Sequence, residues 1–512
     1  MKVVVDSLAW LEKSKLSEDN LRNLRTALTI FPKKTSSHPS SDDPDPIYLY
    51  EDRDDQFGVP REFFRQKASK QNEVTVNVSD GVPMNGFGTK MRFEGSYEEQ
   101  STALEAMAEY DNGIDWGGQL LQGKCGFGKT NCGLEYARRR GRRTLIIVHK
   151  TMFLRQWRER IEEFMPEATV GIIQADVCET DCDFVIAMVH SLVNHVAAVK
   201  NGDPTKYPKN VFDGFGTVLI DECHRIGAST WSEVMKFIPA RYRVGLTATP
   251  RRKDGAEDVF RMHIGPIVYK AHSQPIVPKL RKLATIAELQ DVEGWQKIDG
   301  DWHRHKTSKD NLILSQIETQ LSNNEFRTRQ IAEVIVGAAA DQRKSLVISS
   351  RIEHLWDLKN EIAKLNPNLT VDAYTGSWFV LDEHGNRTVK KIKGKLEPKT
   401  KTRTEEELEQ AEKAQVVLAT KQMVEEGLDI PAVDALFLTM PMSDIEQAVG
   451  RCQRECLPRA SKCERLCSWR SGVCTGKPIP VVIDVVDESI TQLQRKWNDR
   501  RNFYQSIGVQ SA

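Results

Sequence analysis

The stretch GKCGFGKT, residues 123–130, has the spacing of a loop that binds phosphate groups. Its glycines let the backbone turn tightly, so that N–H groups of the bend and of a following helix can surround a β-phosphate. Lys129 would neutralise the β- and γ-oxygens, and the Thr130 hydroxyl would bind Mg²⁺. The loop glycines that we assign to this nucleotide site are Gly123, Gly126 and Gly128. The stretch therefore predicts a site for a nucleoside triphosphate, ATP, with Mg²⁺.

Two adjacent carboxylates, Asp221 and Glu222, follow the apolar run VLI at residues 218–220. Asp221 would reach the Mg²⁺ ion, and Glu222 would polarise the attacking water. An acidic pair at a strand end is more often a helix cap or a solvated turn when it stands alone. The phosphate-binding loop upstream makes the catalytic interpretation the stronger one.

Two series of short apolar runs surround these motifs. The first series is TLIIVH (144–149), FVIAMV (184–189), TVLIDE (217–222) and YRVGLTAT (242–249). The second series is SLVISS (345–350), TVDAYTG (370–376), QVVLAT (415–420), DALFLTM (434–440) and PVVIDVV (480–486). Valine, isoleucine and leucine runs that alternate with helical stretches are typical of parallel sheets covered on both faces. We therefore predict an α/β fold with two doubly wound parallel sheets in tandem, whose active sites lie at the carboxyl ends of strands.

The charge composition indicates that any nucleic-acid-binding surface is confined to part of the protein. Among 512 residues, Lys and Arg number 72, and Asp and Glu also number 72, so the formal net charge is zero. A nucleic-acid surface must then be a local basic region on a neutral body. We find neither a signal peptide nor a membrane span in the sequence, and ten cysteines without a secretion signal favour reduced thiols. We expect an intracellular protein, in the cytoplasm of the host cell if it is viral, without a membrane partner.

The order of the motifs resembles that of superfamily 2 helicases. The phosphate loop, DECH (221–224) and TAT (247–249) are similar to motifs I, II and III. VHKTMFLRQW (148–157), VISSRIEHL (347–355), VEEGLDIP (424–431) and QAVGRCQR (447–454) resemble motifs Ia, IV, V and VI. Within the superfamily, FGVPREFF (57–64), YRVGLTATPRRKDG (242–255) and HIGPIVY (263–269) resemble the XPB-like branch. That branch includes phage branch-migration helicases and related DNA helicases of large DNA viruses.

The resemblance implies roles for further residues of the nucleotide site. Gln100 would read the adenine edge, and Gln447 would position water or the γ-phosphate. Arg451 and Arg454 lie three residues apart, so both guanidiniums can project from one face of a helix as arginine fingers. Gly427 and Asp429 would couple the nucleotide to the nucleic-acid strand, with Asp429 contacting either a ribose or an arginine finger.

Other residues are candidates for contact with nucleic acid. Thr247 and Thr249 would connect the nucleotide site to the strand-binding surface. The candidate contacts to the strand itself are Lys150, Thr151, Arg155 and Thr420. Trp157 is a weaker candidate, because a tryptophan in a helix more often belongs to the core.

By this resemblance, the two predicted sheets are RecA-like domains that follow a small N-terminal α+β accessory domain. The expected boundaries are 1–85 for the accessory domain that engages DNA, 86–275 for the ATP-binding RecA-like domain, 276–320 for a linker and 321–505 for the second RecA-like domain. The second domain would carry a basic insertion at 377–410 and a cysteine-rich insertion at 455–477.

Both insertions allow two interpretations. The stretch NRTVKKIKGKLEPKTKTR, residues 386–403, carries eight Lys and Arg residues and would either bind phosphates or form a solvated loop. In the cysteine-rich insertion, four thiolates would either hold a structural zinc ion or remain free or partly buried thiols. The four are Cys456, Cys463, Cys467 and Cys474, whose spacing departs from the usual C-x₂-C pairs.

These motifs together predict an ATP- and Mg²⁺-dependent DNA helicase or translocase, and the resemblance to the XPB-like branch implies that it moves 3′ to 5′. It would remodel forked or branched DNA in recombination, replication or repair, and a viral or phage origin is plausible. We expect DNA as the main partner, together with replication, recombination or transcription proteins. The alternatives are an RNA helicase and a duplex DNA translocase that releases transcripts. A non-motor scaffold that binds nucleic acid is the weakest alternative, because a scaffold needs no complete hydrolytic set.

Overall fold

A computed structural model of the chain describes most of the 512 residues. The described ranges are 2–33, 45–67, 72–113, 116–124, 126–223, 228–248, 255–272, 276–298, 301–392, 395–425, 428, 430–453 and 478–509. The chain divides into two compact units, Met1–Ser273 and Gln274–Ala512. No helix among the described residues is long and apolar enough to span a membrane.

The first unit contains an eight-stranded sheet with the order β11-β10-β12-β9-β13-β14-β8-β15. Its strands are β8 (Gly117–Gln122), β9 (Thr144–Val148), β10 (Val170–Gln174), β11 (Val177–Cys178), β12 (Phe184–Met188), β13 (Thr217–Asp221), β14 (Tyr242–Thr247) and β15 (Ile267–Lys270). Only β11 pairs antiparallel to its neighbour. The runs predicted as strands in this half each contain one of these strands, so the predicted parallel α/β sheet is confirmed.

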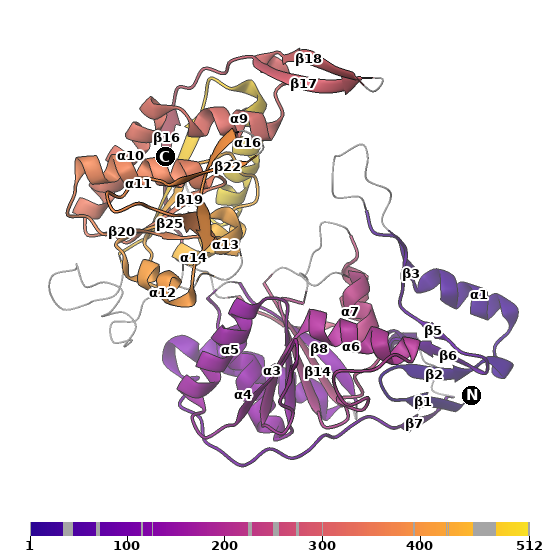
Figure 1. Cartoon of the computed structure of the whole chain (residues 1–512). Helices are drawn as coiled ribbons and strands as arrows, with labels where there is room; N and C mark the ends of the chain where they lie inside the picture. The colour runs from indigo at the N-terminus through magenta and orange to yellow at the C-terminus, as the bar shows by residue number, and fades with distance from the viewer. Residues whose placement is uncertain are drawn as a thin grey trace. The chain divides into compact units, whose positions relative to one another are not determined.

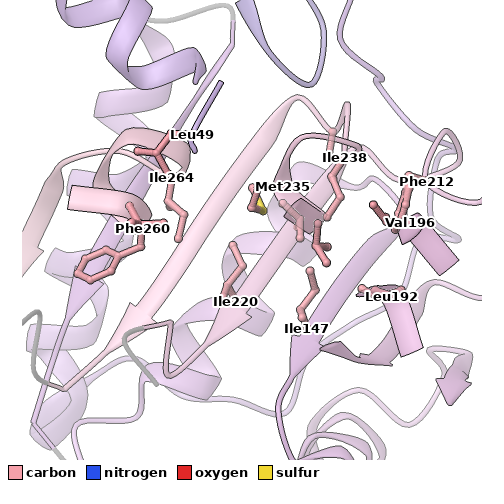
Figure 2. Packing of buried hydrophobic residues seen from close by; sticks show 14 of the residues in the cluster. Leu49, Ile147, Leu192, Val196, Phe212, Ile220, Met235, Ile238, Phe260 and Ile264 are labelled. Atoms are coloured by element: carbon pink, nitrogen blue, oxygen red, sulfur yellow. The ribbon is translucent and has the colours of Figure 1, made fainter. Parts of the chain in front are cut away.

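Helices cover both faces of this sheet (Figure 1). They are α3 (Glu98–Asn112), α4 (Lys129–Arg140), α5 (Thr151–Phe164), α6 (Val189–Asn201), α7 (Ala228–Met235) and α8 (Glu257–His263). One core cluster joins the sheet to α3, α4 and α5, and another joins its other face to α6, α7 and α8. Figure 2 shows this second cluster, in which Ile147 and Ile220 of the sheet face Met235 and Leu192. Strands β9 and β13 are consequently buried at every position.

The N-terminal residues form a smaller five-stranded sheet with the order β5-β6-β2-β1-β7. Its strands are β1 (Lys2–Val5), β2 (Ala9–Glu12), β5 (Glu51–Asp52), β6 (Gln56–Val59) and β7 (Glu73–Val76), with α1 (Glu18–Ala27), α2 (Arg61–Lys67) and the short pair β3 (Thr29–Ile30) and β4 (Ile47–Tyr48) beside them. This sheet belongs to the same compact unit as the eight-stranded sheet.

Two buried arginines join the smaller sheet to the larger one. The Arg243 guanidinium, in β14, donates to the carbonyls of Ser7 at 2.8 Å, Ile238 at 2.7 Å and His263 at 2.9 Å. Arg61, in α2, donates to the carbonyl of Ala240 at 3.0 Å. Buried guanidiniums are costly unless their N–H groups are hydrogen-bonded, so these carbonyls, from the turn after β1, the segment before β14 and the end of α8, fix them in place.

The second unit contains a six-stranded parallel sheet with the order β16-β27-β26-β19-β25-β20. Its strands are β16 (Lys279–Thr285), β19 (Ser345–Ser349), β20 (Val371–Tyr374), β25 (Val416–Thr420), β26 (Ala435–Leu438) and β27 (Val481–Asp487). Its helices are α9 (Leu314–Ser322), α10 (Glu325–Ala340), α11 (Ile352–Leu365), α12 (Glu405–Lys413), α13 (Lys421–Glu425), α14 (Glu446–Cys452) and α16 (Thr491–Ser506). This is the second doubly wound sheet that the sequence predicts.

The segment expected as a linker, residues 276–320, contains regular structure. Strand β16 forms the edge of the six-stranded sheet, and a hairpin of β17 (Val292–Ile298) and β18 (Asp301–Thr307) extends away from that sheet (Figure 1). The basic stretch 386–403 also forms strands, which are β22 (Val389–Ile392), β23 (Lys395–Pro398) and β24 (Thr400–Thr402), the last paired with β21 (Ser377–Phe379).

Candidate active site

The phosphate-loop residues follow the carboxyl end of β8. The N–H of Gly123 donates to the carbonyl of Thr247 at 3.0 Å, which ties the start of the loop to the end of β14. Gly126 and Gly128 both have a φ of 88°, in the left-handed region that favours glycine. A Cβ at Gly128 would also lie 2.7 Å from Nε2 of Gln100, so a side chain at this position would displace the Gln100 amide. Helix α4 then begins at Lys129, which places its N-terminus at the loop.

The buried side chain of Gln100 lies against this loop. Its Nε2 donates to the carbonyl of Phe127 at 2.8 Å. Its Oε1 is buried and has no hydrogen-bond partner within the protein. A buried acceptor without a partner normally has a reason, and the exocyclic amino group of adenine is a donor of the required kind. The environment of Gln100 therefore fits an adenine nucleotide.

The two carboxylates lie beside the loop at the end of β13. Nζ of Lys129 is 3.9 Å from Oε1 of Glu222, and it donates to the carbonyl of Gly123 at 2.9 Å. Glu222 has a φ of 45°, an uncommon conformation for a residue with a side chain. The N–H of Cys223 donates to the carbonyl of Leu246 at 3.3 Å, which joins this turn to β14. The structure therefore brings the loop lysine and the acidic pair together at one edge of the sheet.

Asp221 lies in a surrounding that disfavours its charged form. Burial, followed by the neighbouring charge of Glu222, raises the pKa of Asp221 to about 6. The indole of Trp157 and the ammonium of Lys129 act in the opposite direction. A divalent cation would relieve this cost by neutralising the carboxylates, so Asp221 fits the expected Mg²⁺ site. Thr130, the other expected ligand, lies in the first turn of α4, directly after the loop.

Trp157 is a buried residue, and its place in an amphipathic helix is the only feature of the sequence that indicates its role. Its side chain is 1% exposed, which agrees with the interpretation of Trp157 as a core residue. Nε1 donates to Oδ2 of Asp221 at 2.8 Å. The sequence gives no sign of this contact, because the two residues are 64 positions apart and only the fold brings them together.

The other candidate contacts of the first unit lie near the same edge. Lys150 is the N-cap of α5, and Thr151 is exposed at its first position. Arg155 lies one turn later, with Nε 3.5 Å from Oε1 of Glu159. Thr247 is fully buried at the end of β14. Thr249 lies outside the described residues.

The second unit carries its own group of predicted residues. Thr420 ends β25, and Gln447 and Arg451 lie in α14. Arg451 is 9% exposed, and its Nη2 donates to the carbonyl of Val424 at 3.2 Å. Oε1 of Gln447 is buried without a hydrogen-bond partner within the protein. The remaining predicted residues of this unit, Arg454, Gly427, Asp429 and the four cysteines Cys456, Cys463, Cys467 and Cys474, lie outside the described residues.

Among the residues that the structure describes, no three His, Cys, Asp or Glu side chains gather closely enough to hold a metal ion. The zinc hypothesis concerns cysteines outside those residues, so nothing here supports it. The expected Mg²⁺ site differs in kind, because Mg²⁺ usually takes only one or two protein carboxylates and completes its shell with water and phosphate oxygens.

Two family profiles match the chain. Residues 96–252 match the family described as type III restriction enzyme, res subunit, and residues 327–456 match the helicase conserved C-terminal domain. The first match spans the loop, the carboxylate pair and β14. The second spans β19, β20, β25, β26 and α14.

Several proteins named as helicases or translocases are similar in sequence. A candidate ATP-dependent RNA helicase, L396 of Acanthamoeba polyphaga mimivirus, is 25% identical over 97% of this chain and 83% of its own length. Helicase D10 of Escherichia phage T5 is 27% identical over 38% of this chain and 41% of its own length. The DNA 3′–5′ translocase XPB2 of Sulfurisphaera tokodaii is 27% identical over 43% of this chain and 44% of its own length. With the loop lysine and the acidic pair grouped at one edge of a parallel sheet, these matches show that the chain belongs to the superfamily 2 helicases, enzymes that hydrolyse nucleoside triphosphates and act on nucleic acid.

Proposed function

We propose that this helicase is an ATP-driven motor that moves 3′ to 5′ on DNA and remodels forked or branched DNA in recombination, replication or repair. The main support for ATP-driven motor activity is the grouping of Lys129, Asp221 and Glu222 at the carboxyl edge of the first sheet. A protein that only binds nucleic acid has no need for this set, so the grouping favours turnover over a scaffold role.

The proposed roles rest on the motif to which each residue belongs, supported for Gln100, Lys129, Asp221 and Glu222 by the contacts described above. ATP with Mg²⁺ supplies the bond whose hydrolysis provides the energy for movement. Gln100 accepts a hydrogen bond from the adenine edge, and Lys129 neutralises phosphate charge. Thr130 and Asp221 hold the metal. Glu222 orients the attacking water and accepts its proton.

The second unit would complete this chemistry. Arg451 and Arg454, which are spaced to share one face of a helix, would stabilise charge that develops in the transition state, an effect worth roughly 10³–10⁵ in rate for arginine fingers. Gln447, whose buried Oε1 has no partner within the protein, would position water or phosphate. Gly427 and Asp429 would link nucleotide state to strand binding.

The strand itself would contact both units. In the first unit, backbone amides and side chains at Lys150, Thr151 and Arg155 would bind phosphates, and Thr247 with Thr249 would couple them to the nucleotide site. In the second unit, Thr420 at the end of β25 would do the same. Cycles of closure and opening between two RecA-like domains would then move the strand.

The proposals that the substrate is DNA and that movement is 3′ to 5′ are supported by similarity to other proteins. One relative is named as a DNA 3′–5′ translocase, and the residues that resemble the XPB-like branch favour DNA. The proposed accessory role of residues 1–85 is to engage DNA beside the motor. The chief alternative is RNA, because the relative that aligns with 97% of this chain is named as an RNA helicase. A duplex translocase that releases transcripts is the other alternative.

The test is the steady-state ATPase rate with single-stranded, forked, four-way-junction and duplex DNA and with matched RNA, with Lys129→Ala as the inactive control. Strong stimulation by forks and junctions, followed by unwinding of substrates with a 3′ but not a 5′ loading strand, would support the proposal. Stimulation by RNA alone would replace DNA with RNA as the substrate. Stimulation by duplex DNA alone would favour the translocase, and no stimulation would overturn the motor.

The structural zinc ion stays a separate proposal for Cys456, Cys463, Cys467 and Cys474. Metal analysis of protein purified without chelators tests it directly. Close to one zinc per chain, lost on replacing Cys463 with Ser, would support the site. Zinc far below one per chain would leave free or buried thiols as the interpretation.

A further inference from the structure

Helix α5 connects two parts of the first unit. It begins at Thr151, just after β9, at the edge of the sheet where the loop and the carboxylates lie. Less than two turns further along, Trp157 is buried on the face that packs against the sheet, together with Phe153, Leu154 and Ile161. The helix therefore begins at the surface near the loop and places the indole of Trp157, with its polar N–H group, in the interior.

The indole of Trp157 has two distinct contacts. Its Nε1–H donates to Oδ2 of Asp221 at 2.8 Å, in a fully buried hydrogen bond. Its ring lies beside α4, because a Cβ built on Gly133 would be 3.6 Å from Cη2 of Trp157. One side chain thus contacts both the helix that follows the phosphate loop and the carboxylate expected to hold Mg²⁺.

This hydrogen bond limits the freedom of the carboxylate. An aspartate side chain has two rotatable bonds, and an acceptor oxygen held by a rigid, packed donor fixes the second of them. A carboxylate without this donor could rotate, and would be left with a buried oxygen that lacks its partner. When a group that orients a metal-binding side chain in this way is removed, metal affinity or activity commonly falls by about 10- to 100-fold.

We propose that Trp157 is a positioning residue for Asp221, and that its indole N–H holds this carboxylate in the orientation needed for Mg²⁺ at the nucleotide site. The proposal rests on the proposed function, which assigns the metal to Asp221. It adds a residue from the region resembling motif Ia to the machinery of the first unit. A tryptophan that served only to fill the core would need a ring of this size but no donor aimed at Asp221.

The experiment measures how much Mg²⁺ tightens nucleotide binding. A fluorescent, non-hydrolysable ATP analogue is titrated in EDTA and in excess Mg²⁺, and the ratio of the two dissociation constants is compared between variants. In Trp157→Phe, which keeps an aromatic ring and loses the N–H, the ratio falls by about tenfold while the affinity in EDTA stays within about twofold of wild type. The kcat for ATP falls by a similar factor at saturating Mg²⁺.

Two further variants separate positioning from packing. Trp116→Phe removes an indole from another buried tryptophan of the same unit, one that stacks on Phe64 and does not contact Asp221. It should lower the unfolding temperature without changing the Mg²⁺ ratio. Trp157→His offers a smaller ring with an N–H donor, and it should recover part of the ratio despite poorer packing. It also serves as the second variant if the phenylalanine protein does not fold.

The experiment separates failure of the positioning role of Trp157 from failure of the proposed function. If wild-type protein binds the analogue no better with Mg²⁺ than with EDTA, the assignment of the nucleotide site itself is wrong. If wild type shows the Mg²⁺ effect and a folded Trp157→Phe protein retains the full ratio and kcat, Trp157 is a core residue and the positioning role is overturned.

Discussion

Nζ of Lys129 lies 3.9 Å from Oε1 of Glu222 while it donates to the carbonyl of Gly123 at 2.9 Å. The ammonium thus bridges the first residue of the phosphate loop and the second carboxylate of the acidic pair. The loop glycines and the turn after β13 are far apart in the sequence, and both are tied by backbone hydrogen bonds to the end of β14. The geometry of the site therefore depends on three neighbouring strands ending at one edge.

Replacing Glu222 with Gln should abolish most ATP turnover. The amide keeps the shape of the side chain but cannot accept a proton from water, and loss of such a base typically costs about 10²–10⁴ in rate. Binding of ATP should stay close to that of wild type, because Lys129 and the loop remain. Single-turnover hydrolysis and equilibrium binding measure the two effects. Unchanged turnover would show that Glu222 is not the base.

Replacing Gln100 with Ala should weaken selection of adenine. The variant loses the buried Oε1 acceptor and also the hydrogen bond to the Phe127 carbonyl. We expect KM for ATP to rise by about tenfold, with a much smaller change for UTP. Gln100→Glu is the matched control, because it keeps an acceptor and loses the donor. Equal changes for both nucleotides in both variants would indicate a role in loop structure alone.

Replacing Arg243 with Met should destabilise the first unit. The carbonyls of Ser7, Ile238 and His263 would lose their buried donor, at a cost of about 3 kcal/mol or more. Thermal unfolding and limited proteolysis within residues 1–85 measure the effect. Arg22→Met is the control, since Arg22 forms only an exposed pair with Asp19, and such pairs contribute little. Wild-type stability of the Arg243 variant would mean that the two sheets associate without this contact.

The stability of the first unit should fall in mild acid, in part because of His263. This imidazole is buried, and Nε2 lies 3.0 Å from Oγ of Ser232. Burial, aided by Arg243 and Lys236, lowers the pKa of His263 well below its ordinary value of 6.5. The folded protein therefore keeps His263 neutral while the unfolded chain binds a proton, so stability is lost as pH falls below the unfolded pKa.

The measurement is the urea midpoint at about pH 7.5 and about pH 5.5, for wild type and for His263→Asn. Asparagine cannot take up a proton, so the variant should show a smaller drop between the two pH values. His272→Asn is the control, because that side chain is exposed. An identical pH dependence in wild type and His263→Asn would remove His263 as a cause.

The basic hairpin of β22 and β23 offers a test of phosphate binding. Lys390 and Lys391 are exposed there, whereas Lys401 and Arg403 of the same stretch pair with Glu407 and Asp372. Replacing Lys390 and Lys391 with Ala should weaken DNA binding regardless of sequence. The slope of log affinity against log salt should fall by up to about 2, close to one per phosphate contact. The exposed Lys364, replaced with Ala, is the control, and an unchanged slope would favour a solvated hairpin.

Much of the fold was predictable because its signals are local. The phosphate loop is a contiguous stretch whose glycines and lysine must be neighbours to surround a phosphate. The apolar runs at 144–149 and 217–222 mark β9 and β13, since strands covered on both faces are apolar at every position. The strands within residues 276–320 were harder to predict, and this segment was expected to be a linker. Strand β16 within it lies at an edge of the sheet and is mostly exposed, so KLRKLAT lacks the apolar run that identified the other strands.

The sequence by itself therefore determined the two parallel sheets, the phosphate loop and the acidic pair, because each depends on residues adjacent in the chain. Only the tertiary structure decided which distant groups complete the site. Trp157 reaches Asp221 across 64 positions, and Arg243 reaches Ser7 across 236. Such contacts follow from the spatial order of strands β9, β13 and β14 in the sheet, and no local pattern encodes the partner of a buried N–H group. A buried donor must find an acceptor, but the fold alone chooses which one.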